Sequence, residues 1–442
     1  MSTLVVHPQE KPLNGIVTVP GDKSISHRAV MLAGLAQGKS QIHNWLPAGD
    51  TIATLDAIQR LGVRVTVKRH SNQAWDLIID GRGLHGLREP DTTLDCRNAG
   101  TCMRLLAGIL AGQSFATVLD GSVQLRQRPM NRIIDPLTQM GARIKAQNGR
   151  APLYIESADL KGIRYVMPVA SAQVKSAILL AGLYATGDTQ IVQPGPARDH
   201  TERMLQAMEV PVTIEGGSIT LETSGDEERQ LKSLDLIVPG DLSSAAFLLV
   251  AAMIVPHSSI IIKGAGFNET RTGLLEILSS MGAHIEKSNT HLSGGETITD
   301  LSIHFNELHS AEIGGDLVVR TIDELPVWAV AASQAAGVSV LRDAAELRVK
   351  EVDRISLLAG ELQKMGVHID EHPDGFTVKG PSRLQGMDVD SHGDHRLGMA
   401  LAIAGLVGTS PTRVHHADCI ADSFPGFVEA MGSLGAQIRE IQ

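Results

Sequence analysis

The segment Asp22–Arg28, which reads DKSISHR, places two cationic side chains at the start of a predicted helix. The unpaired backbone N–H groups and the dipole at a helix N-terminus attract anions. Lys23 and Arg28 oppose that dipole unless an anion is bound, and Ser24 shares a helix face with Arg28. The pattern favours a binding site for an anion such as a phosphate over a capped helix with solvated charges.

Four further segments in the first half combine small, polar or cationic residues in front of apolar runs or in predicted loops. Small residues let a ligand approach backbone amides closely. Each segment alone is also consistent with a plain turn, a helix cap or a solvated charge run. They are Asn98-Ala99-Gly100-Thr101, Ser171-Ala172-Gln173 with Lys175 behind it, Arg126, Arg128 and Arg132 around Pro129, and Arg198-Asp199-His200.

The second half adds carboxylates to the cations. Thr321–Glu324 (TIDE) is expected to cap the fifth apolar helix, Leu347–Arg354 reads LRVKEVDR, and His392–Arg396 (HGDHR) opens the sixth. The paired histidines could be metal ligands, but neither an HExxH motif nor a carboxylate triad accompanies them. Neither a GxxxxGK[ST] loop nor a GxSxG motif occurs. We therefore expect neither a metal nor a cofactor.

The composition excludes several classes of partner. The net charge is 39 − 49 = −10 and aromatic residues make up 3% of the chain, which disfavours nucleic acid and anionic membranes. Three cysteines without ligand spacing argue against disulfides and zinc. The N-terminal sequence has no signal-peptide pattern, and the apolar stretch 243–256 is too short to span a bilayer comfortably. We expect a cytoplasmic protein.

A repeat that predicts a helix, a turn and a strand occurs six times. A glycine that closes the helix is followed at once by a predicted strand with a β-branched residue, and only the third copy lacks the glycine. The copies are LGVRV from Leu61, MGARI from Met140, MEVPV from Met208, MGAHI from Met281, MGVHI from Met365 and LGAQI from Leu434.

Six helices that are apolar all round alternate with these repeats and are therefore expected to be buried. They are ISHRAVMLAGLAQG, CMRLLAGILAGQ, AQVKSAILLAGLYATG, SSAAFLLVAAMIV, ELPVWAVAASQAAG and DHRLGMALAIAGLVG. The predicted fold is α/β, with buried helices and β-strands outside them.

A length of 442 residues suggests two domains. VPGDKS (Val19–Ser24) and VPGDLS (Val238–Ser243) open the first and fourth buried helices, with Asp and Ser as capping candidates. We predict one domain at 21–240 and a discontinuous one at 1–20 plus 241–442. The two chain crossings near Gly21 and Gly240 predict a hinge.

Nine motifs occur in the order and approximate spacing of the 5-enolpyruvylshikimate-3-phosphate (EPSP) synthase family, which the chain resembles over essentially its whole length. The motifs are PGDKSISHRA, NAGTCMRLL, RPM, SAQVKSA, RDHTE, TIDELP, LRVKEVDR, GDHR and SFP. The sequences ASAQVKSA, RDHTE and LRVKE are similar to those of the class II branch, which includes glyphosate-tolerant bacterial enzymes. The resemblance implies a monomer of two similar domains, each an inverted (inside-out) α/β barrel of three repeats, that closes over its substrates.

The resemblance also implies a reaction. The 5-hydroxyl of shikimate 3-phosphate attacks C2 of phosphoenolpyruvate, and the tetrahedral intermediate loses phosphate, without a metal or a covalent enzyme intermediate. This enolpyruvyl transfer belongs to chorismate and aromatic amino acid biosynthesis. Asp323 would accept the hydroxyl proton, and Glu351 with Lys23 would transfer a proton at the methylene carbon, which requires a tuned pKa.

Binding roles follow from the matched motifs. The residues implied for shikimate 3-phosphate are Lys23, Ser24, Arg28, Ser171, Ala172, Gln173, Arg198, Asp323 and Lys350. Those implied for phosphoenolpyruvate are Lys23, Gly100, Arg128, Gln173, Arg354 and Arg396. Several arginines suit two phosphates and two carboxylates, because guanidinium groups pair bidentately with both.

Three positions depart from family patterns. Asp422 stands where many members carry a lysine near phosphoenolpyruvate, so that cation is missing at this position. Leu105 stands where many relatives carry Pro, and Gly100 stands where the glyphosate-tolerant branch carries Ala. We expect Gly100 to leave room for glyphosate as a competitive inhibitor.

Three other functions fit the sequence less well than this one. The related UDP-N-acetylglucosamine enolpyruvyl transferases use a cysteine in a mobile Gly-rich Arg-Pro loop, and none of the three cysteines lies in such a loop. A non-catalytic sugar-phosphate binder would not need both Asp323 and Glu351. An RNA-end cyclase is disfavoured by the acidic charge and the few aromatic residues.

Overall fold

The computed structural model describes residues 2–71, 73–222 and 229–441. The chain divides into two compact units. Unit 1 comprises Met1–Pro20, Pro239–His291 and Thr297–Gln442, and unit 2 comprises Gly21–Val238 and Leu292–Glu296. Each unit has its own buried hydrophobic core.

The described residues of unit 2 form three four-stranded sheets, each accompanied by helices. The first sheet has the order β14 (Asp235–Ile237), β3 (Lys39–Trp45), β5 (Trp75–Asp80), β4 (Arg64–Arg69), with helices α1 (Lys23–Leu35) and α2 (Gly49–Arg60). The second has the order β6 (Leu94–Asp95), β7 (Thr117–Asp120), β9 (Arg150–Glu156), β8 (Arg143–Gln147), with α3 (Gly100–Ala111), α4 (Val123–Gln127) and α5 (Asn131–Gln139). The third has the order β10 (Arg164–Val166), β11 (Thr189–Val192), β13 (Ser218–Leu221), β12 (Val212–Glu215), with α6 (Ala172–Gly182) and α7 (His200–Ala207).

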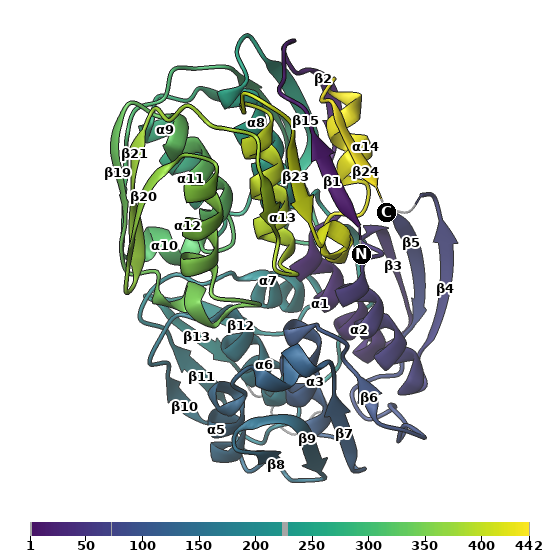
Figure 1. The fold of residues 1–442 in the computed structure, drawn as a ribbon. Coiled ribbons are helices and arrows are strands. Elements are labelled where there is room, and N and C mark those ends of the chain that lie inside the picture. The colour runs from purple at the N-terminus through teal and green to yellow at the C-terminus, as the bar shows by residue number, and fades with distance from the viewer. Residues whose placement is uncertain (1, 72, 223–228, 442) are drawn as a thin grey trace. The chain divides into compact units, whose positions relative to one another are not determined.

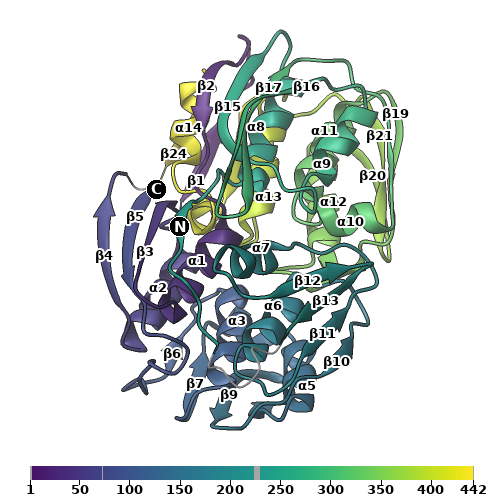
Figure 2. The same cartoon turned by 180° about the vertical axis from the view of Figure 1, so that it is seen from behind.

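Unit 1 repeats this plan, and Figures 1 and 2 show its helices with strands around them. Its first sheet has the order β16 (Ile285–Ser293), β17 (Glu296–His304), β15 (Ser259–Gly266), β2 (Asn14–Thr18), with α8 (Leu242–Ile254) and α9 (Gly273–Ser280). The second has the order β18 (Glu312–Ile313), β19 (Gly337–Leu341), β21 (Gly375–Gly380), β20 (His368–His372), with α10 (Asp316–Thr321), α11 (Leu325–Gln334), the 3₁₀ helix η1 (Ala345–Val349) and α12 (Arg354–Lys364). The third has the order β22 (Asp388–Asp390), β23 (Thr412–His415), β1 (Thr3–Val6), β24 (Ile438–Ile441), with α13 (His395–Gly405), the 3₁₀ helix η2 (Ala417–Asp422) and α14 (Phe427–Ser433).

The sheets share one pairing pattern, in which a parallel pair is followed by antiparallel ones. In unit 2, β6 pairs in parallel with β7, whereas β9 pairs antiparallel with both β7 and β8. The N-terminal strand β1 takes the place of β9 in the last sheet of unit 1, where Leu4 lies opposite both Val414 and Glu440. The predicted α/β fold of two similar halves, each with three repeats, buried helices and outer sheets, is confirmed.

The six predicted helix ends are also confirmed. Each of the helices α2, α5, α7, α9, α12 and α14 is followed by a residue with positive φ and then by a strand. A positive φ favours glycine because it has no Cβ, and five of the six residues are glycine. The residues are Gly62, Gly141, Gly282, Gly366, Gly435 and, in the third copy, Glu209 with φ 60°.

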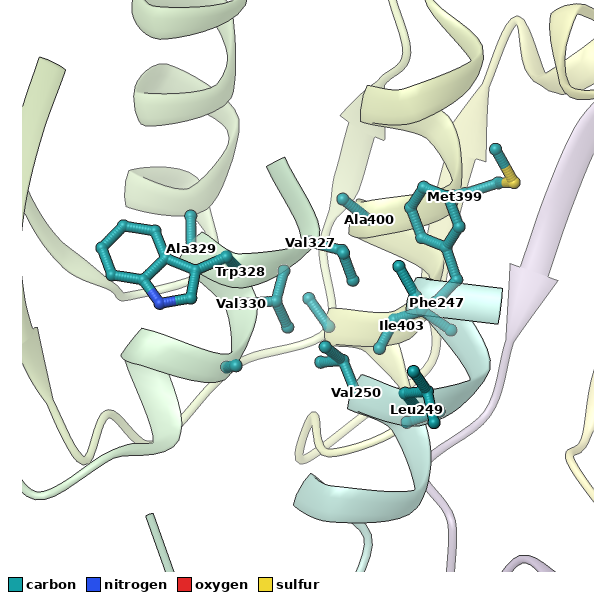
Figure 3. Close-up of a cluster of buried hydrophobic side chains, with 14 of the residues drawn as sticks. Phe247, Leu249, Val250, Val327, Trp328, Ala329, Val330, Met399, Ala400 and Ile403 are labelled. Atoms are coloured by element: carbon teal, nitrogen blue, oxygen red, sulfur yellow. The ribbon is translucent and has the colours of Figure 1, made fainter. Parts of the chain in front are cut away.

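The apolar helices form the cores as expected, and all 13 residues of α8 are buried. Figure 3 shows side chains of α8, α11 and α13, among them Phe247, Val327 and Ile403, meeting in the core of unit 1. In unit 2, α3 and α6 approach so closely that a Cβ on Gly108 would lie 2.3 Å from the carbonyl oxygen of Ala177. This contact accounts for a glycine at this position.

The predicted caps are partly confirmed. Asp22, Asp241 and Ser171 accept hydrogen bonds from the first turns of α1, α8 and α6. The expectation that Thr321–Glu324 caps the fifth helix is wrong, since Glu324 occupies the cap position of α11 without a side-chain cap bond. Its carboxylate instead accepts a hydrogen bond from Ser243 Oγ, because both side chains are buried and each needs a partner.

Two predicted loops contain helices. Arg126 lies in α4 and Arg132 in α5, so only Arg128 of the three lies between helices, and His200 begins α7. Short amphipathic turns of this kind carry too few residues for a clear helical period. Within the described ranges no helix is long and apolar enough to cross a membrane.

Candidate active-site residues in the two units

Lys23 is the first residue of α1 in unit 2, and the preceding Asp22 fixes the helix start by accepting from Ile25 N at 2.9 Å. Its Nζ lies 3.2 Å from Asp50 Oδ2, and both side chains are less than a fifth exposed. Asp50 is in the first turn of α2. The carboxylate therefore compensates the charge that Lys23 adds at the positive end of the helix.

Arg28 is buried one turn further along α1. Its Nε donates to Thr201 Oγ1 at 2.8 Å, Nη2 to Ser176 Oγ at 2.8 Å and Nη1 to the carbonyl oxygen of Ser24 at 2.9 Å. Thr201 and Ser176 belong to α7 and α6, so Arg28 ties three helices together at their N-terminal halves. Ser24 and Arg28 both lie in α1, one turn apart, as expected.

Three carboxylates and one further cation act on the charge of Arg28. Burial lowers the pKa of Arg28 to about 10, although Glu202 and Asp22 oppose this, and the nearby cation of Arg198 lowers it further. Arg198, which is only partly buried, disfavours the charge of Arg28, whereas the carboxylates favour it, and a bound phosphate or carboxylate would favour it further.

Gln173 joins α6 to α3. Its Oε1 accepts from Nη1 of Arg104 at 2.5 Å, and its Nε2 donates to Thr101 Oγ1 at 2.8 Å. Gly100, the first residue of α3, lies beside two guanidinium groups, because a Cβ added there would be 3.0 Å from Arg104 Nη1 and 3.1 Å from Arg128 Nη1. The structure thus brings Gly100, Arg128 and Gln173 together.

Arg104 was not among the predicted site residues. It lies in a helix whose other side chains, apart from Thr101, are apolar, and it is itself only 7% exposed. A lone arginine within a buried, mostly apolar helix needs polar partners, and this need is the sequence signal that could have identified Arg104.

Ser171 and Ala172 lie at the N-terminus of α6, where Ser171 Oγ accepts from Val174 N at 3.4 Å. Lys175, one turn on, is fully enclosed and lies 2.6 Å from Glu202 Oε1, with Nζ also donating to the carbonyl of Ala197 at 3.0 Å. The burial and internal pairing of Lys175 indicate a structural role, whereas Ser171 and Ala172 are only partly buried.

In unit 1, Asp323 is surrounded by cations. One of its oxygens lies 3.5 Å from Arg354 Nη1 and 3.8 Å from Lys350 Nζ, and the other lies 3.9 Å from Arg396 Nη2. Lys350 follows η1, Arg354 begins α12 and Arg396 lies in the first turn of α13. Residues from three separate segments therefore converge on one carboxylate.

Arg354 has three carboxylate partners. Nη2 donates to Glu351 Oε2 at 2.7 Å and Nε to Asp394 Oδ2 at 2.8 Å, in addition to the longer contact with Asp323. Burial by itself lowers the pKa of Arg354, but the charges of Asp394, Glu351 and Asp323 outweigh it and raise the pKa. Burial lowers the pKa of Lys350, and the negative charge of Asp323 opposes this shift.

This cluster suits proton transfer next to anion binding. Carboxylates in a partly dehydrated, cationic setting can serve as acid or base, and guanidinium and ammonium groups can stabilise negative charge that develops on a substrate. Asp422, the residue that departs from the family pattern, is the last residue of η2, and its side chain is an anion where a cation was expected. Among residues 2–71, 73–222 and 229–441, no group of three or more His, Cys, Asp or Glu side chains is placed to hold a metal ion.

The sequence model of one family, described as EPSP synthase (3-phosphoshikimate 1-carboxyvinyltransferase), matches residues 8–431. A 3-phosphoshikimate 1-carboxyvinyltransferase of Citrifermentans bemidjiense is 49% identical over 434 residues, which cover 98% of this chain and 99% of the relative. A solved EPSP synthase of Acinetobacter baumannii is 40% identical, with a TM-score of 0.88 and complete coverage of both chains. The enolpyruvyl transferase NikO of Streptomyces tendae shares the fold, with a TM-score of 0.81 at 16% identity. The match covers 100% of this chain and 99% of the NikO chain.

Proposed function

The chain belongs to the EPSP synthase family, and we propose that it transfers the enolpyruvyl group of phosphoenolpyruvate to the 5-hydroxyl of shikimate 3-phosphate, with release of phosphate. The product serves chorismate and aromatic amino acid biosynthesis. The observation that carries the proposal in the structure is the convergence of Lys350, Arg354 and Arg396 on Asp323.

We propose that Asp323 is the base of the addition step. As the 5-hydroxyl oxygen bonds to C2 of phosphoenolpyruvate, its proton passes to the carboxylate of Asp323. The electron pair of the C2–C3 double bond takes a proton at C3, and we assign its delivery to Glu351 with Lys23. The three cations around Asp323 favour its ionised form, which is the form that a base requires.

The tetrahedral intermediate then collapses. The bond between C2 and the phosphate oxygen breaks, C3 gives a proton back, and the double bond is restored. Phosphate leaves with the electron pair of the broken bond, and Arg354 and Arg396 suit the stabilisation of that charge because guanidinium pairs bidentately with phosphate and carboxylate.

The binding roles follow the chemistry of the two half-sites. We assign shikimate 3-phosphate to Lys23, Ser24, Arg28, Ser171, Ala172, Gln173 and Arg198 of unit 2, together with Asp323 and Lys350 of unit 1. We assign phosphoenolpyruvate to Lys23, Gly100, Arg128 and Gln173 of unit 2 and to Arg354 and Arg396 of unit 1. The nearness of the cation of Arg198 to buried Arg28 supports the first assignment, and the guanidinium groups beside Gly100 support the second.

Further proposals concern the assembly and its inhibition. We infer that the two compact units are the domains predicted at 21–240 and at 1–20 plus 241–442, that the protein is a cytoplasmic monomer, and that glyphosate competes with phosphoenolpyruvate. The close approach of the guanidinium groups of Arg104 and Arg128 to Gly100 supports the last point, because any side chain at residue 100 would displace these anion-binding groups.

One assay tests the proposed function. Phosphate release by the purified chain should require shikimate 3-phosphate and phosphoenolpyruvate together and should stop when either is left out. Release with UDP-N-acetylglucosamine in place of shikimate 3-phosphate would assign the chain to the other enolpyruvyl transferases instead.

A further inference from the structure

Asp394 immediately precedes α13 and is fully buried, and its two oxygens have separate tasks. Oδ1 accepts from the backbone N–H groups of Arg396 at 2.8 Å and Leu397 at 3.2 Å. Oδ2 accepts from Nε of Arg354 at 2.8 Å. One carboxylate therefore caps the helix that carries Arg396 and also holds the side chain of Arg354.

The bond to Nε fixes the orientation of Arg354. A guanidinium is planar, so a partner on Nε determines where the two terminal nitrogens point. In this structure they point to Glu351 at 2.7 Å and to Asp323 at 3.5 Å. Arg354 is 1% exposed, so no water competes for the bond to Asp394.

The capping task fixes the backbone from which Arg396 extends. The N–H of Asp394 donates to the carbonyl of Ser391 at 2.9 Å, and Ser391 Oγ donates to the carbonyl of His416 at 2.8 Å. Asp394 is thus itself anchored to a neighbouring segment. The start of α13 cannot move without breaking these bonds.

We propose that Asp394 is a positioning residue for phosphoenolpyruvate, because this single buried carboxylate orients both Arg354 and Arg396. The inference rests on the proposed function, which assigns those two arginines to phosphoenolpyruvate. Asp394 does not itself reach the substrate in this role. It acts through the two cations.

Substitutions at this position separate the two tasks. An asparagine has only one side-chain acceptor oxygen, so it can cap α13 or accept from Arg354 but cannot do both. A serine is a good helix cap but is too short to replace the carboxylate on Arg354 Nε. Asp394→Ser therefore keeps the helix start and removes the hold on Arg354.

The unit offers a matched control in Asp300. This carboxylate is 6% exposed, accepts from the backbone N–H of Gly264 at 2.9 Å and pairs with Lys263 at 2.7 Å. It therefore has the same combination of backbone and cation partners as Asp394, but the cation is not one of the assigned arginines. Asp300→Asn reproduces the cost of the substitution without the positioning effect.

Steady-state kinetics and calorimetry test the inference. In Asp394→Asn and Asp394→Ser, the KM for phosphoenolpyruvate should rise at least about tenfold, as expected for loss of a charge-assisted hydrogen bond. The Kd for shikimate 3-phosphate, measured by titration calorimetry without phosphoenolpyruvate, should stay within about twofold of wild type. Asp300→Asn should change neither value.

The outcomes are distinguishable. An unchanged KM for phosphoenolpyruvate in a folded Asp394 variant, or an equal loss of shikimate 3-phosphate binding, overturns the positioning role. A wild-type chain that releases no phosphate with both substrates overturns the proposed function itself. If both variants fail to fold, the exchange of the Arg354 Nε–H proton with water is measured in the wild-type protein by nuclear magnetic resonance. The signal is assigned by its absence in Arg354→Lys. Slow exchange supports the inference, and rapid exchange refutes it.

Discussion

Gly100 lies against the guanidinium of Arg128, and a Cβ atom at residue 100 would be 3.1 Å from Nη1 of that arginine. Nη1 of Arg104, on the same helix as Gly100, would be equally crowded at 3.0 Å. Arg104 in turn donates to Gln173, so any side chain at residue 100 acts on two of the assigned binding residues. Glycine is therefore part of the site geometry rather than a simple helix start.

Replacement of Gly100 by alanine should displace both guanidinium groups by a few tenths of an ångström. We expect the KM for phosphoenolpyruvate to rise several-fold and the inhibition constant of glyphosate to rise further, since the added methyl group occupies the space that we assign to the inhibitor. Inhibition kinetics at varied phosphoenolpyruvate concentration measure both constants. Uninhibited turnover of the wild-type chain at millimolar glyphosate, with ordinary phosphoenolpyruvate affinity, contradicts the assignment.

Gly360 in α12 provides the control for this substitution. Among the described residues, no atom beyond its chain neighbours and the nearby backbone of α12 lies within 4 Å of the position of its Cβ. Gly360→Ala should leave both constants unchanged and stabilise the protein by roughly 0.5–1 kcal/mol, because alanine loses less conformational freedom in a helix. A parallel loss of phosphoenolpyruvate affinity in this variant would trace the Gly100 effect to folding instead.

Substitution of Asp323 by asparagine should lower kcat far more than it changes binding. The amide keeps the shape of the side chain but cannot accept the hydroxyl proton, and loss of a general base costs about 10²- to 10⁴-fold in rate. Phosphate release under saturating substrates gives kcat, and calorimetry gives the Kd for shikimate 3-phosphate. Asp388→Asn, an exposed carboxylate 3.9 Å from Arg413 in the same unit, should keep wild-type kinetics.

A second result would remove the base assignment. If Asp323→Asn retains kcat while its KM values rise, the carboxylate only orders the three cations around it, and another group accepts the proton.

His27 should make the stability of the protein depend on pH below neutrality. Burial, with the cations of Lys23 and Arg28, lowers the pKa of His27 well below 6.5, and its Nδ1 lies 2.6 Å from Thr54 Oγ1. The unfolded chain then binds the proton first as pH falls, so stability is present above about pH 6.5 and is lost below it.

Urea unfolding between pH 7 and pH 5 tests this dependence. His27→Asn, which cannot bind the proton, should reduce the slope of unfolding free energy against pH by up to about 1.4 kcal/mol per pH unit. His284→Asn, at an exposed position, should keep the wild-type slope. Identical slopes for wild type and His27→Asn would show that His27 does not titrate differently in the folded state.

The buried pair of Lys175 and Glu202 should support the fold of unit 2 rather than bind substrate. Lys175→Met leaves the carboxylate of Glu202 buried without its cation and should cost roughly 3–5 kcal/mol of unfolding free energy. The double variant Lys175→Met with Glu202→Gln should recover a large part, since the stranded charge is gone. Lys145→Met, which removes an exposed partner of Glu156, should leave the Tm nearly unchanged. A Lys175→Met protein with wild-type Tm contradicts the structural role.

Local patterns in the sequence determined most of the secondary structure. Five of the six repeat helices are followed by a glycine with positive φ, and the third is followed by Glu209, also with positive φ. These conformations depend on backbone sterics within a few residues, so the six repeats could be predicted from the sequence. The apolar helices could likewise be assigned, because a helix without a polar face has to be buried. Asp22 and Asp241 were recognisable as caps for the same local reason.

Only the tertiary structure decided which partners these residues have. Glu324 was expected to cap its own helix but bonds to Ser243, which is 81 residues away. The partner of Arg104 could not be predicted either, since its contact with Gln173 spans 69 residues. Such contacts depend on how helices from different repeats pack, and a single sequence does not contain that information in any local period. The motifs around Lys23 and Asp323 thus indicated the chemistry, whereas packing determined that Asp394 holds one of the arginines and caps the helix of another.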